Sequence, residues 1–277
     1  MIIPTNELNL FCSLNIEKYN SQSLDIAYSF VKNIAKGHYE NFPVGSIFVP
    51  KRLRKYIYSI YTFARIADDI ADEISKENPS EALILLDKYK DCLTNCLSKK
   101  ETNNPIFLSL EDTITENKLP IELFERLLIA FKRDIYFTQP DSFDALFDYC
   151  NYSANPVGEL ILRLFNENND KTIFYSNKIC SALQLINFMQ DLSLDINRNR
   201  NYFPKSLLLN HSTINKDILD EYISVTQNLL NSGATIIKLI SNFRLRTEIR
   251  LILFGGKIML WKIKRYSTKL LRKRPKI

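Results

Sequence analysis

Glycine is scarce in this chain, which has only six glycines in 277 residues. Turn-rich β-sandwiches and barrels, and nucleotide-binding folds with glycine loops, use more glycine than this, whereas long helices joined by short loops do not. The length and the 45% hydrophobic content are enough to bury a large core without disulfides. The low glycine content therefore favours an all-α fold.

Cysteine and histidine are also few. The five cysteines are odd in number and scattered, and the N-terminal stretch MIIPTNELNL lacks the basic start and apolar core of a signal peptide. These features predict a reduced, cytoplasmic protein. Cys92 and Cys96 lie four apart on one helical face, but only His38 and His211 could complete a metal site there, so two half-buried thiols are the simpler interpretation. No apolar run approaches the ~20 residues of a membrane span.

Positive charge is concentrated at the C-terminus. Up to Glu248 the chain has 27 basic and 31 acidic residues, a net charge of −4, and the ten bases that follow, with no acid among them, carry +10. Nucleic-acid binding usually needs bases spread over a domain face, whereas here they alternate with apolar residues in an amphipathic pattern. The pattern favours peripheral contact with an anionic membrane over nucleic acid, and a last helix packed on the bundle with a frayed basic end is the structural alternative. The apolar members of the pattern are Ile258, Leu260, Trp261, Ile263, Leu270 and Leu271.

Helical periodicity recurs along the whole chain, without an internal repeat or a linker that would divide it. Prolines lie at or outside the ends of the periodic segments, as expected for a residue that cannot continue a helix. We therefore expect one large helical bundle that forms a single domain over residues 1–277 and ends in a basic C-terminal helix. The predicted helices cover approximately 21–37, 51–75, 79–99, 103–117, 120–138, 142–166, 171–197, 214–243 and 247–272.

The stretch RIADDIADE, from Arg65 to Glu73, places four carboxylates at the end of a segment that otherwise reads as a buried helix. Residues four apart return to within ~40° of the same direction, so Asp68 and Asp72 lie on one helical face, together with Tyr61 and Arg65. A solvated helix face is the alternative interpretation, although acids near a helix C-terminus oppose the helix dipole.

The stretch NFMQDLSLDINRNRNYFP, residues 187–204, repeats this arrangement. Asn187, Asp191 and Asp195 follow one another at four-residue steps on one helical face. Like charges at this spacing are unfavourable by a few tenths of a kcal/mol on an isolated helix, and a cation between them would reverse the sign. The second motif makes a solvated face a poor explanation for both.

Both motifs offer the oxygen ligands that Mg²⁺ prefers, and this ion is commonly bound through one or two carboxylates plus the phosphates of a substrate. Arg65, Arg198 and Arg200 lie in or beside the motifs and would complement phosphate oxygens. Two acidic faces meeting across a bundle cavity would hold a metal cluster for a diphosphate, whose departure leaves a carbocation to be shielded from water and stabilised by aromatic faces. Aromatic residues near the motifs, for which core packing is the alternative role, are Phe42, Tyr58, Tyr61, Phe63, Tyr149, Tyr152, Phe188, Tyr202 and Phe203.

In these two acidic motifs the chain resembles the squalene/phytoene synthases, the head-to-head branch of the isoprenoid synthases. Arg65 to Asp72 is similar to the family's Arg-x-x-Asp-Asp-x-x-Asp motif, and Asn187 to Tyr202 resembles its Asn-x-x-x-Asp-x-x-x-Asp motif with the Arg-x-Tyr element that follows. YCNYSANPVGELIL from Tyr149 and GHYENFPVGSIFVP from Gly37 look like two further family elements.

The resemblance implies the α-helical isoprenoid synthase fold with a central active-site cavity, dependence on Mg²⁺ and a prenyl diphosphate lipid as substrate. It implies metal ligands at Asp68, Asp72, Asn187, Asp191 and Asp195, which are also catalytic together with Arg65, Tyr149 and Tyr202. It implies contacts with substrate at His38, Tyr61, Arg65, Tyr149, Asn155, Gln190, Arg200 and Tyr202. Asp69 and Glu73 point about a hundred degrees away from the ligand face, and we expect them to support the ligands.

Two stretches depart from the usual family pattern. HYENF from His38 lacks the small hydroxyl residues common there, and GGKIMLW from Gly255 lacks a tyrosine near the pocket. Both departures, and SANPVG from Ser153, resemble the hydroxysqualene synthase branch of bacterial hopanoid pathways. The predicted reaction is ionisation of presqualene diphosphate and capture of the carbocation by water, with Asn155 holding the water.

Two alternatives stay open. One is a phytoene, dehydrosqualene or squalene synthase that condenses two prenyl diphosphates. The reductant needed for squalene has no recognisable site, because no G-x-G-x-x-G fingerprint occurs in the sequence. The other is a non-catalytic helical adaptor that keeps the fold and binds at a membrane surface. Loss of acids from the two motifs would favour this alternative, but all of them are present.

Overall fold

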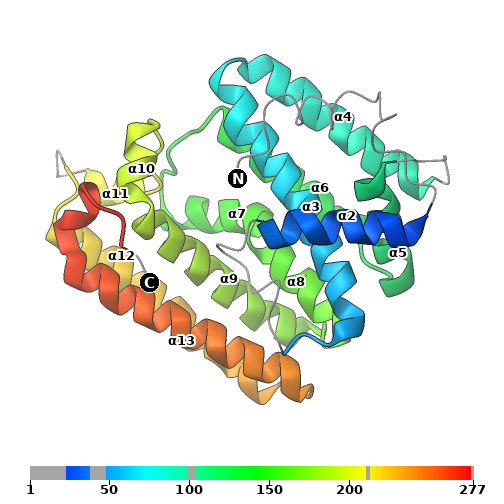
Figure 1. Cartoon of the computed structure of the whole chain (residues 1–277). Coiled ribbons are helices and arrows are strands. Elements are labelled where there is room, and N and C mark those ends of the chain that lie inside the picture. Colours follow the sequence, from blue (N-terminus) through cyan, green and yellow to red (C-terminus); the bar gives the residue numbers. More distant parts are fainter. Residues whose placement is uncertain (1–22, 38–47, 99–103, 210–212, 276–277) are drawn as a thin grey trace. The chain divides into compact units, whose positions relative to one another are not determined.

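The computed structural model describes residues 23–37, 48–98, 104–209 and 213–275, and Figure 1 shows the course of the chain. Every regular element in these ranges is a helix and none is a strand, so the predicted all-α fold is confirmed. The chain divides into two compact units, residues 1–136 and 137–277. The single domain expected over residues 1–277 stays a prediction. No helix in the described ranges has the length and apolar character needed to cross a membrane.

The first unit is built around α3, which carries the first acidic motif and against which α2, α4, α5 and α6 pack. Phe63 of α3 stacks on Tyr89 of α4 with 5.0 Å between ring centroids and meets Phe124 of α6 edge-on at 5.5 Å. Its helices are α2 (Leu24–Gly37), α3 (Lys51–Glu73), η2 (Ile74–Lys76), α4 (Pro79–Leu97), α5 (Pro105–Asn117) and α6 (Ile121–Ile135).

Helix starts in this unit follow the local sequence. Pro79 and Pro105 occupy the first helical position of α4 and α5, where a missing N–H costs nothing. The preceding asparagines cap both helices: the Asn78 side chain accepts from the Glu81 N–H at 3.1 Å, and Asn104 accepts from the Ile106 N–H at 2.9 Å.

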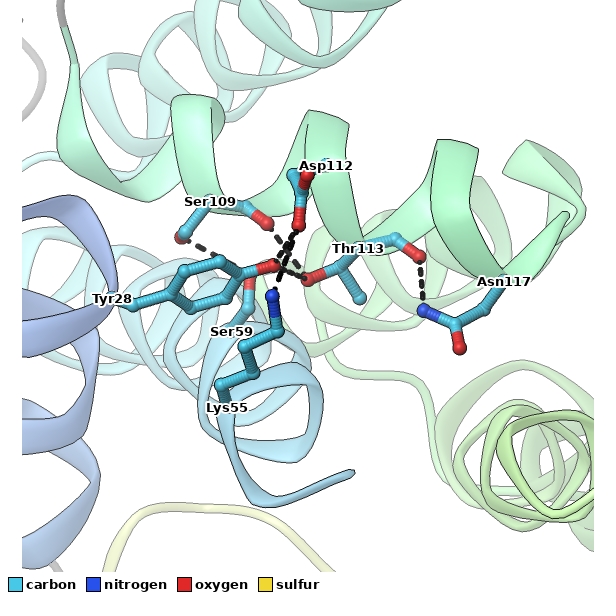
Figure 2. Close-up of polar contacts among 7 residues, drawn as sticks. All are labelled: Tyr28, Lys55, Ser59, Ser109, Asp112, Thr113 and Asn117. Carbon is cyan, nitrogen blue, oxygen red and sulfur yellow. Dashed lines mark hydrogen bonds and ion pairs between the residues drawn. The ribbon is translucent and has the colours of Figure 1, made fainter. Parts of the chain in front are cut away.

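A polar cluster ties α2, α3 and α5 together (Figure 2). The Tyr28 hydroxyl donates to the Asp112 carboxylate at 2.6 Å and lies 3.2 Å from the Thr113 hydroxyl. The Lys55 ammonium lies 3.6 Å from the same carboxylate and 4.5 Å from the centroid of the Tyr28 ring. Burial, and then the bond to Asp112, raise the pKa of Tyr28, so its hydroxyl stays a donor.

This cluster also sets the rotation of α3 about its axis. The buried Ser59 hydroxyl of α3 lies 3.2 Å from that of Ser109 on α5, which turns this side of α3 toward α5. Asp68 follows Ser59 by nine residues, which is about 180° around a helix. The anchoring of Ser59 therefore turns the Asp68 carboxylate to the opposite side of α3.

The second unit is built around α9, which α7, α8, α12 and α13 contact. In Figure 1 the orange α13 runs alongside α12 in this unit. The helices are α7 (Phe143–Ser153), α8 (Asn155–Leu164), α9 (Asp170–Gln190), α10 (Leu192–Asn197), α11 (Lys205–Leu208), α12 (Lys216–Gly233), η3 (Ala234–Lys238), α13 (Phe243–Tyr266) and η4 (Ser267–Leu271).

Two of the predicted helices are interrupted. The segment expected as one helix over 142–166 is broken at Ala154, between α7 and α8, because Pro156 enters the first turn of α8 and cannot supply a helical N–H. The segment expected over 171–197 is interrupted at Asp191, whose ψ of 6° departs from the helical value. The Asp191 N–H still donates to the Asn187 carbonyl at 2.8 Å, so the chain direction changes little there.

The apolar residues of the basic tail divide into two groups. Leu260, Ile263 and Leu270 are fully buried, because they lie on the side of the tail that packs within the unit, and the prediction that Leu260 faces a membrane is wrong. Trp261 is on the other side and 56% of its surface is exposed. The last helix is thus both packed on the bundle and exposed along one aromatic-bearing face.

Glycine is needed where helices approach α9 most closely. A Cβ at Gly233 of α12 would lie 2.6 Å from Ile179 Cγ1 and 3.2 Å from the Tyr175 carbonyl oxygen of α9, whereas a Cβ at Gly255 of α13 would meet nothing within 4 Å. Main-chain atoms cannot move aside as a side chain can, so the spacing of α12 and α9 depends on Gly233.

We predict that Gly233→Ala lowers the free energy of unfolding by about 1–3 kcal/mol, because α12 and α9 would have to separate. Gly255→Ala is the matched control and should leave stability unchanged or raise it by up to about 1 kcal/mol, since alanine is the better helix former. Urea unfolding followed by circular dichroism measures both. Equal stability of the two variants would contradict the close-approach argument.

Candidate active site

The first acidic motif is organised around Arg65. Its Nη2 lies 2.5 Å from Asp69 Oδ1, and its Nη1 lies 3.7 Å from Asp68 Oδ2. The Asp69 side chain is 3% exposed and that of Asp68 is 43% exposed. Asp69 therefore orients the arginine from the buried side, in the supporting position that was expected for it, while Asp68 keeps an accessible carboxylate. Tyr61 and Asp72, both half-buried, lie one turn to either side on α3.

Negative charge in this motif exceeds what Arg65 neutralises. The surrounding protein and then the neighbouring Asp72 carboxylate raise the pKa of Asp68 to about 7, against the lowering effect of Arg65. Since 43% of the Asp68 side chain contacts solvent, we attribute the raised pKa mainly to repulsion from the neighbouring carboxylates. Burial also raises the pKa of Asp69. The motif can reduce this repulsion by taking up a proton or a cation.

The second acidic motif spans the junction of α9 and α10. Asn187 lies in the last turn of α9, Asp191 at the junction and Asp195 in α10, and all three are half-buried. The Asp195 N–H donates to the Asp191 carbonyl at 2.9 Å, so the four-residue spacing expected of a helix persists through the junction. The side chains of Asn187, Asp191 and Asp195 therefore keep the one-turn spacing that places them on the same side of the chain.

The chain turns back immediately after α10. Asn199 has a φ of 56°, in the left-handed region that asparagine tolerates. The Arg200 N–H then donates to the Asp195 carbonyl at 2.8 Å. This turn holds the half-buried Arg200 at the end of the second motif and leads into Tyr202.

Two residues of the second motif contact the C-terminal segment. Arg274 forms a close ion pair with Asp191 through its Nε and Oδ1, and its Nη2 donates to Asp191 Oδ2 at 3.4 Å. Gln190 Nε2 donates to the Pro275 carbonyl at 3.4 Å. Sequence reasoning missed Arg274 as a site residue, since its only signal was membership of a basic tail 83 residues away from Asp191.

Three of the aromatic rings that the sequence places near the motifs, Tyr149, Phe188 and Tyr202, lie together beside this motif. Phe188 and Tyr202 stack with 3.7 Å between ring centroids and 8° between ring planes. Tyr149 lies 6.0 Å from Phe188 and 5.8 Å from Tyr202. Phe137, which the sequence analysis did not single out, meets Tyr202 edge-on at 4.9 Å. This aromatic cluster, Phe137, Tyr149, Phe188 and Tyr202, is an apolar surface with π faces three residues from Asp191.

Asn155 is buried at the start of α8 and connects helices. Its Nδ2 donates to Asn151 Oδ1 at 2.8 Å, and its Oδ1 accepts from the Ser181 hydroxyl of α9 at 3.1 Å. These bonds give it a structural role, and one amide hydrogen remains beyond the one donated to Asn151. His38, another predicted substrate contact, lies outside the described residues.

The donor set of each motif fits a hard divalent cation. Both motifs offer carboxylate oxygens, the ligands that such ions prefer: repulsion raises the pKa of Asp68 in the first motif, and Asp191 of the second motif already binds a cation, the Arg274 guanidinium. In the part of the chain that the structure describes, no group of three or more His, Cys, Asp or Glu side chains forms a complete ligand set. Away from both motifs, burial raises the pKa of Cys96 to about 12, so the thiol beside Cys92 is protonated at neutral pH.

Comparison with known proteins places these features in context. The family model described as squalene/phytoene synthase matches residues 35–277. A hydroxysqualene synthase from Sinorhizobium fredii is 32% identical over 234 residues, which cover 79% of this chain and 78% of the relative. The crystal structure of squalene synthase HpnC from Alicyclobacillus acidocaldarius is similar with a TM-score of 0.81 and 32% identity, over 88% of this chain and 95% of that one.

A second solved structure bears on the fold alone. A dehydrosqualene synthase crystallised with a ligand is similar with a TM-score of 0.72 and 20% identity, over 90% of this chain and 99% of that one. Both solved structures agree with the α-helical isoprenoid synthase fold that the acidic motifs implied.

We predict that Asp68→Asn stabilises the metal-free protein more at pH 8 than at pH 5. The folded state holds the Asp68 proton up to about pH 7, whereas the unfolded chain releases it near 3.8, so stability falls as pH rises through this window. Asparagine does not ionise, so the variant does not lose this stability as the pH rises. Thermal unfolding in EDTA from pH 5 to 8.5 measures it, with the exposed Asp91→Asn as the matched charge control. A difference from wild type that stays constant across this range would contradict the repulsion at Asp68.

Proposed function

The chain belongs to the squalene/phytoene synthase family, an enzyme family that acts on prenyl diphosphates with divalent metal ions, and on this basis we propose that it is a hydroxysqualene synthase. The proposed reaction is Mg²⁺-dependent ionisation of presqualene diphosphate followed by capture of the carbocation by water. The bond between carbon and diphosphate oxygen breaks with its electron pair on the diphosphate. A water oxygen then bonds to the cationic carbon and releases one proton.

The acidic motifs supply the polar half of this reaction. Asp68, Asp72, Asn187, Asp191 and Asp195 would hold the divalent cations, and His38, Tyr61, Arg65, Gln190 and Arg200 would contact the diphosphate. Bound Mg²⁺ would neutralise the charge that develops on the departing diphosphate. Arg65 is oriented for its role by the buried Asp69, which leaves the other edge of the guanidinium toward Asp68. A planar guanidinium fixed in this way suits the paired oxygens of a phosphate group.

The observation that carries the proposal is the aromatic cluster beside the second acidic motif. Phe188 and Tyr202 are nearly parallel at 3.7 Å, and both are buried. The rings cover each other's inner faces, so it is the outer π faces of the stacked pair that would stabilise a carbocation close to the diphosphate, while the apolar rings would exclude bulk water. Tyr149 adds a third ring and a polar hydroxyl to the same cluster. An ion pair of diphosphate and carbocation needs this combination of acidic motif and aromatic surface.

The choice of water as nucleophile is supported by the relatives and by one side chain. The first relative compared is named for the alcohol product. Asn155 has one amide hydrogen left after its bond to Asn151, and this hydrogen would position the attacking water. The buried position of Asn155 would limit the number of waters that it can hold.

Squalene, dehydrosqualene or phytoene formation is the second candidate. The solved structure with 32% identity is described as a squalene synthase. Formation of squalene requires a hydride from a reductant. The sequence carries no G-x-G-x-x-G fingerprint for a dinucleotide. Loss of a proton instead of water capture would give a polyene hydrocarbon. The products therefore separate the candidates directly.

We predict that the purified enzyme with presqualene diphosphate and Mg²⁺ releases hydroxysqualene and inorganic diphosphate, and that NADPH changes neither product. Oxygen-18 water should label the product hydroxyl, because the oxygen comes from solvent and not from the diphosphate. Mass spectrometry of the extracted lipid measures the label. A hydrocarbon as the main product would transfer the assignment to the second candidate.

Asp68→Asn and Asp191→Asn are the inactive controls for this experiment. Each keeps side-chain size but removes a charged oxygen ligand, so turnover should fall at least about a hundredfold while helical circular dichroism stays at the wild-type level. Asp91→Asn, an exposed acid of α4, should retain full activity. Substantial turnover in a folded Asp191→Asn variant would remove the second motif from the reaction.

We also propose that α13 contacts an anionic membrane surface, where a lipid diphosphate would reach the enzyme. Leu251, Phe254 and Trp261 are 50%, 64% and 56% exposed, and their helical spacing places them within one face of α13. Basic residues lie along the same helix, and the Arg265 guanidinium sits 4.8 Å over the Trp261 ring. Exposed aromatic and basic side chains on one helix suit the headgroup region of an anionic bilayer.

We predict that the enzyme cosediments with phosphatidylglycerol vesicles at low salt and not with phosphatidylcholine vesicles, since each basic residue near an anionic surface contributes about 1 kcal/mol. Phe254→Ser with Trp261→Ser should reduce the bound fraction severalfold. Phe174→Ser is the matched control, an aromatic of α9 that is 55% exposed and carries Lys178 over its ring at 4.7 Å. Equal binding to both vesicle types would refute this contact.

A further inference from the structure

The C-terminal segment returns to the second acidic motif because packing holds it there. At the end of α13 the chain reverses at Ser267, whose φ of 49° and ψ of −135° are values that favour glycine. Leu270, three residues later, is completely buried, and η4 contacts α10 and α12. Serine does not favour this conformation locally, so burial of Leu270 must offset its cost. Residues 267–275, the C-terminal strap, are thereby fixed beside α10.

The strap places a cation on a predicted metal ligand. Arg274 pairs with Asp191, and Pro275 accepts from the adjacent Gln190, so two neighbouring residues of the second motif are engaged. Both side chains of the ion pair are about two thirds shielded from solvent, with 35% and 30% exposed. Half-buried charges at contact distance interact more strongly than a surface pair in water.

The geometry of this pair is poor for a permanent structural bridge. Arg274 Nε forms a close ion pair with Asp191 Oδ1, whereas the second contact, from Arg274 Nη2 to Asp191 Oδ2, is long at 3.4 Å. A guanidinium optimised for a carboxylate makes two parallel hydrogen bonds near 2.8 Å. Arg274 is therefore held against Asp191 mainly by charge, and a competing cation can replace it.

On the basis of the proposed function, we infer that Arg274 is a binding residue of the diphosphate site that occupies Asp191 in the metal-free enzyme. The Asp191 carboxylate cannot pair with the guanidinium and ligate a divalent cation through the same oxygen, so the two cations compete for it. Once displaced, the guanidinium remains on the strap beside the motif, where the oxygens of the substrate diphosphate are the nearest available anions. Arg274 thus opposes metal binding before substrate arrives and favours diphosphate binding afterwards.

The test measures Mn²⁺ binding to EDTA-stripped protein by electron paramagnetic resonance, without substrate and then with inorganic diphosphate. Without diphosphate, Arg274→Gln should tighten the Mn²⁺ Kd by about three- to tenfold, the range expected from loss of a partly shielded ion pair. With Mn²⁺ saturating, the same variant should weaken diphosphate binding by a similar factor, and Arg274→Lys should recover part of that loss. These opposite signs would not arise from a purely structural contact.

Arg272→Gln is the matched control, because it removes the same charge from an exposed position two residues away. It should change either Kd less than twofold. Equal effects of Arg272→Gln and Arg274→Gln would overturn the inference and leave the proposed function standing. If instead Asp191→Asn binds Mn²⁺ as tightly as the wild type, then Asp191 is not a ligand, and both the inference and its role in the proposed function are overturned.

Discussion

Repulsion between carboxylates that share one helical face is the constraint on which both acidic motifs depend. Each motif places its acids four residues apart, a spacing that is unfavourable on a helix without a counter-charge. In each motif an arginine supplies part of that charge: Arg65 between Asp68 and Asp69, and Arg274 against Asp191. The two arginines come from different parts of the chain: Arg65 lies within its own motif, whereas Arg274 lies in the C-terminal segment, 83 residues after Asp191.

The scaffold serves to keep these charges in place against their own repulsion. In the first unit, the polar cluster around Tyr28 and the contact between Ser59 and Ser109 fix how α3 is turned. In the second unit, the close approach of α12 at Gly233 holds α9, whose last residues begin the second motif. Both supports lie away from the acids, so the energy that holds the acids comes from the core.

The sequence predicted most of this arrangement where the signal was local. The helical period located both acidic motifs, and the neighbourhood of the motifs included Tyr149, Phe188 and Tyr202, which do lie together. Asp69 was expected to support the ligands, and the structure pairs it with Arg65 on the buried side of the motif; that it does not ligate the metal stays a prediction. The approach of Arg274 was not predicted, because it depends on packing between segments 83 residues apart, and the helix break at Asp191 had no proline or glycine to signal it. The prediction that Leu260 faces a membrane was wrong because an amphipathic pattern does not show which side of a helix packs against the rest of the protein.

The conformation of Ser267 has a further consequence for how the strap moves. Since the local sequence does not favour the reversed chain, the segment has no tendency to return to α10 by itself once Leu270 leaves its buried position. Intermediate positions would keep the cost of the turn and lose the burial that offsets it. Because buried Leu270 holds the strap beside α10 as a unit, the Arg274 guanidinium can leave Asp191 while the chain itself stays in place, and so it remains close to the second motif.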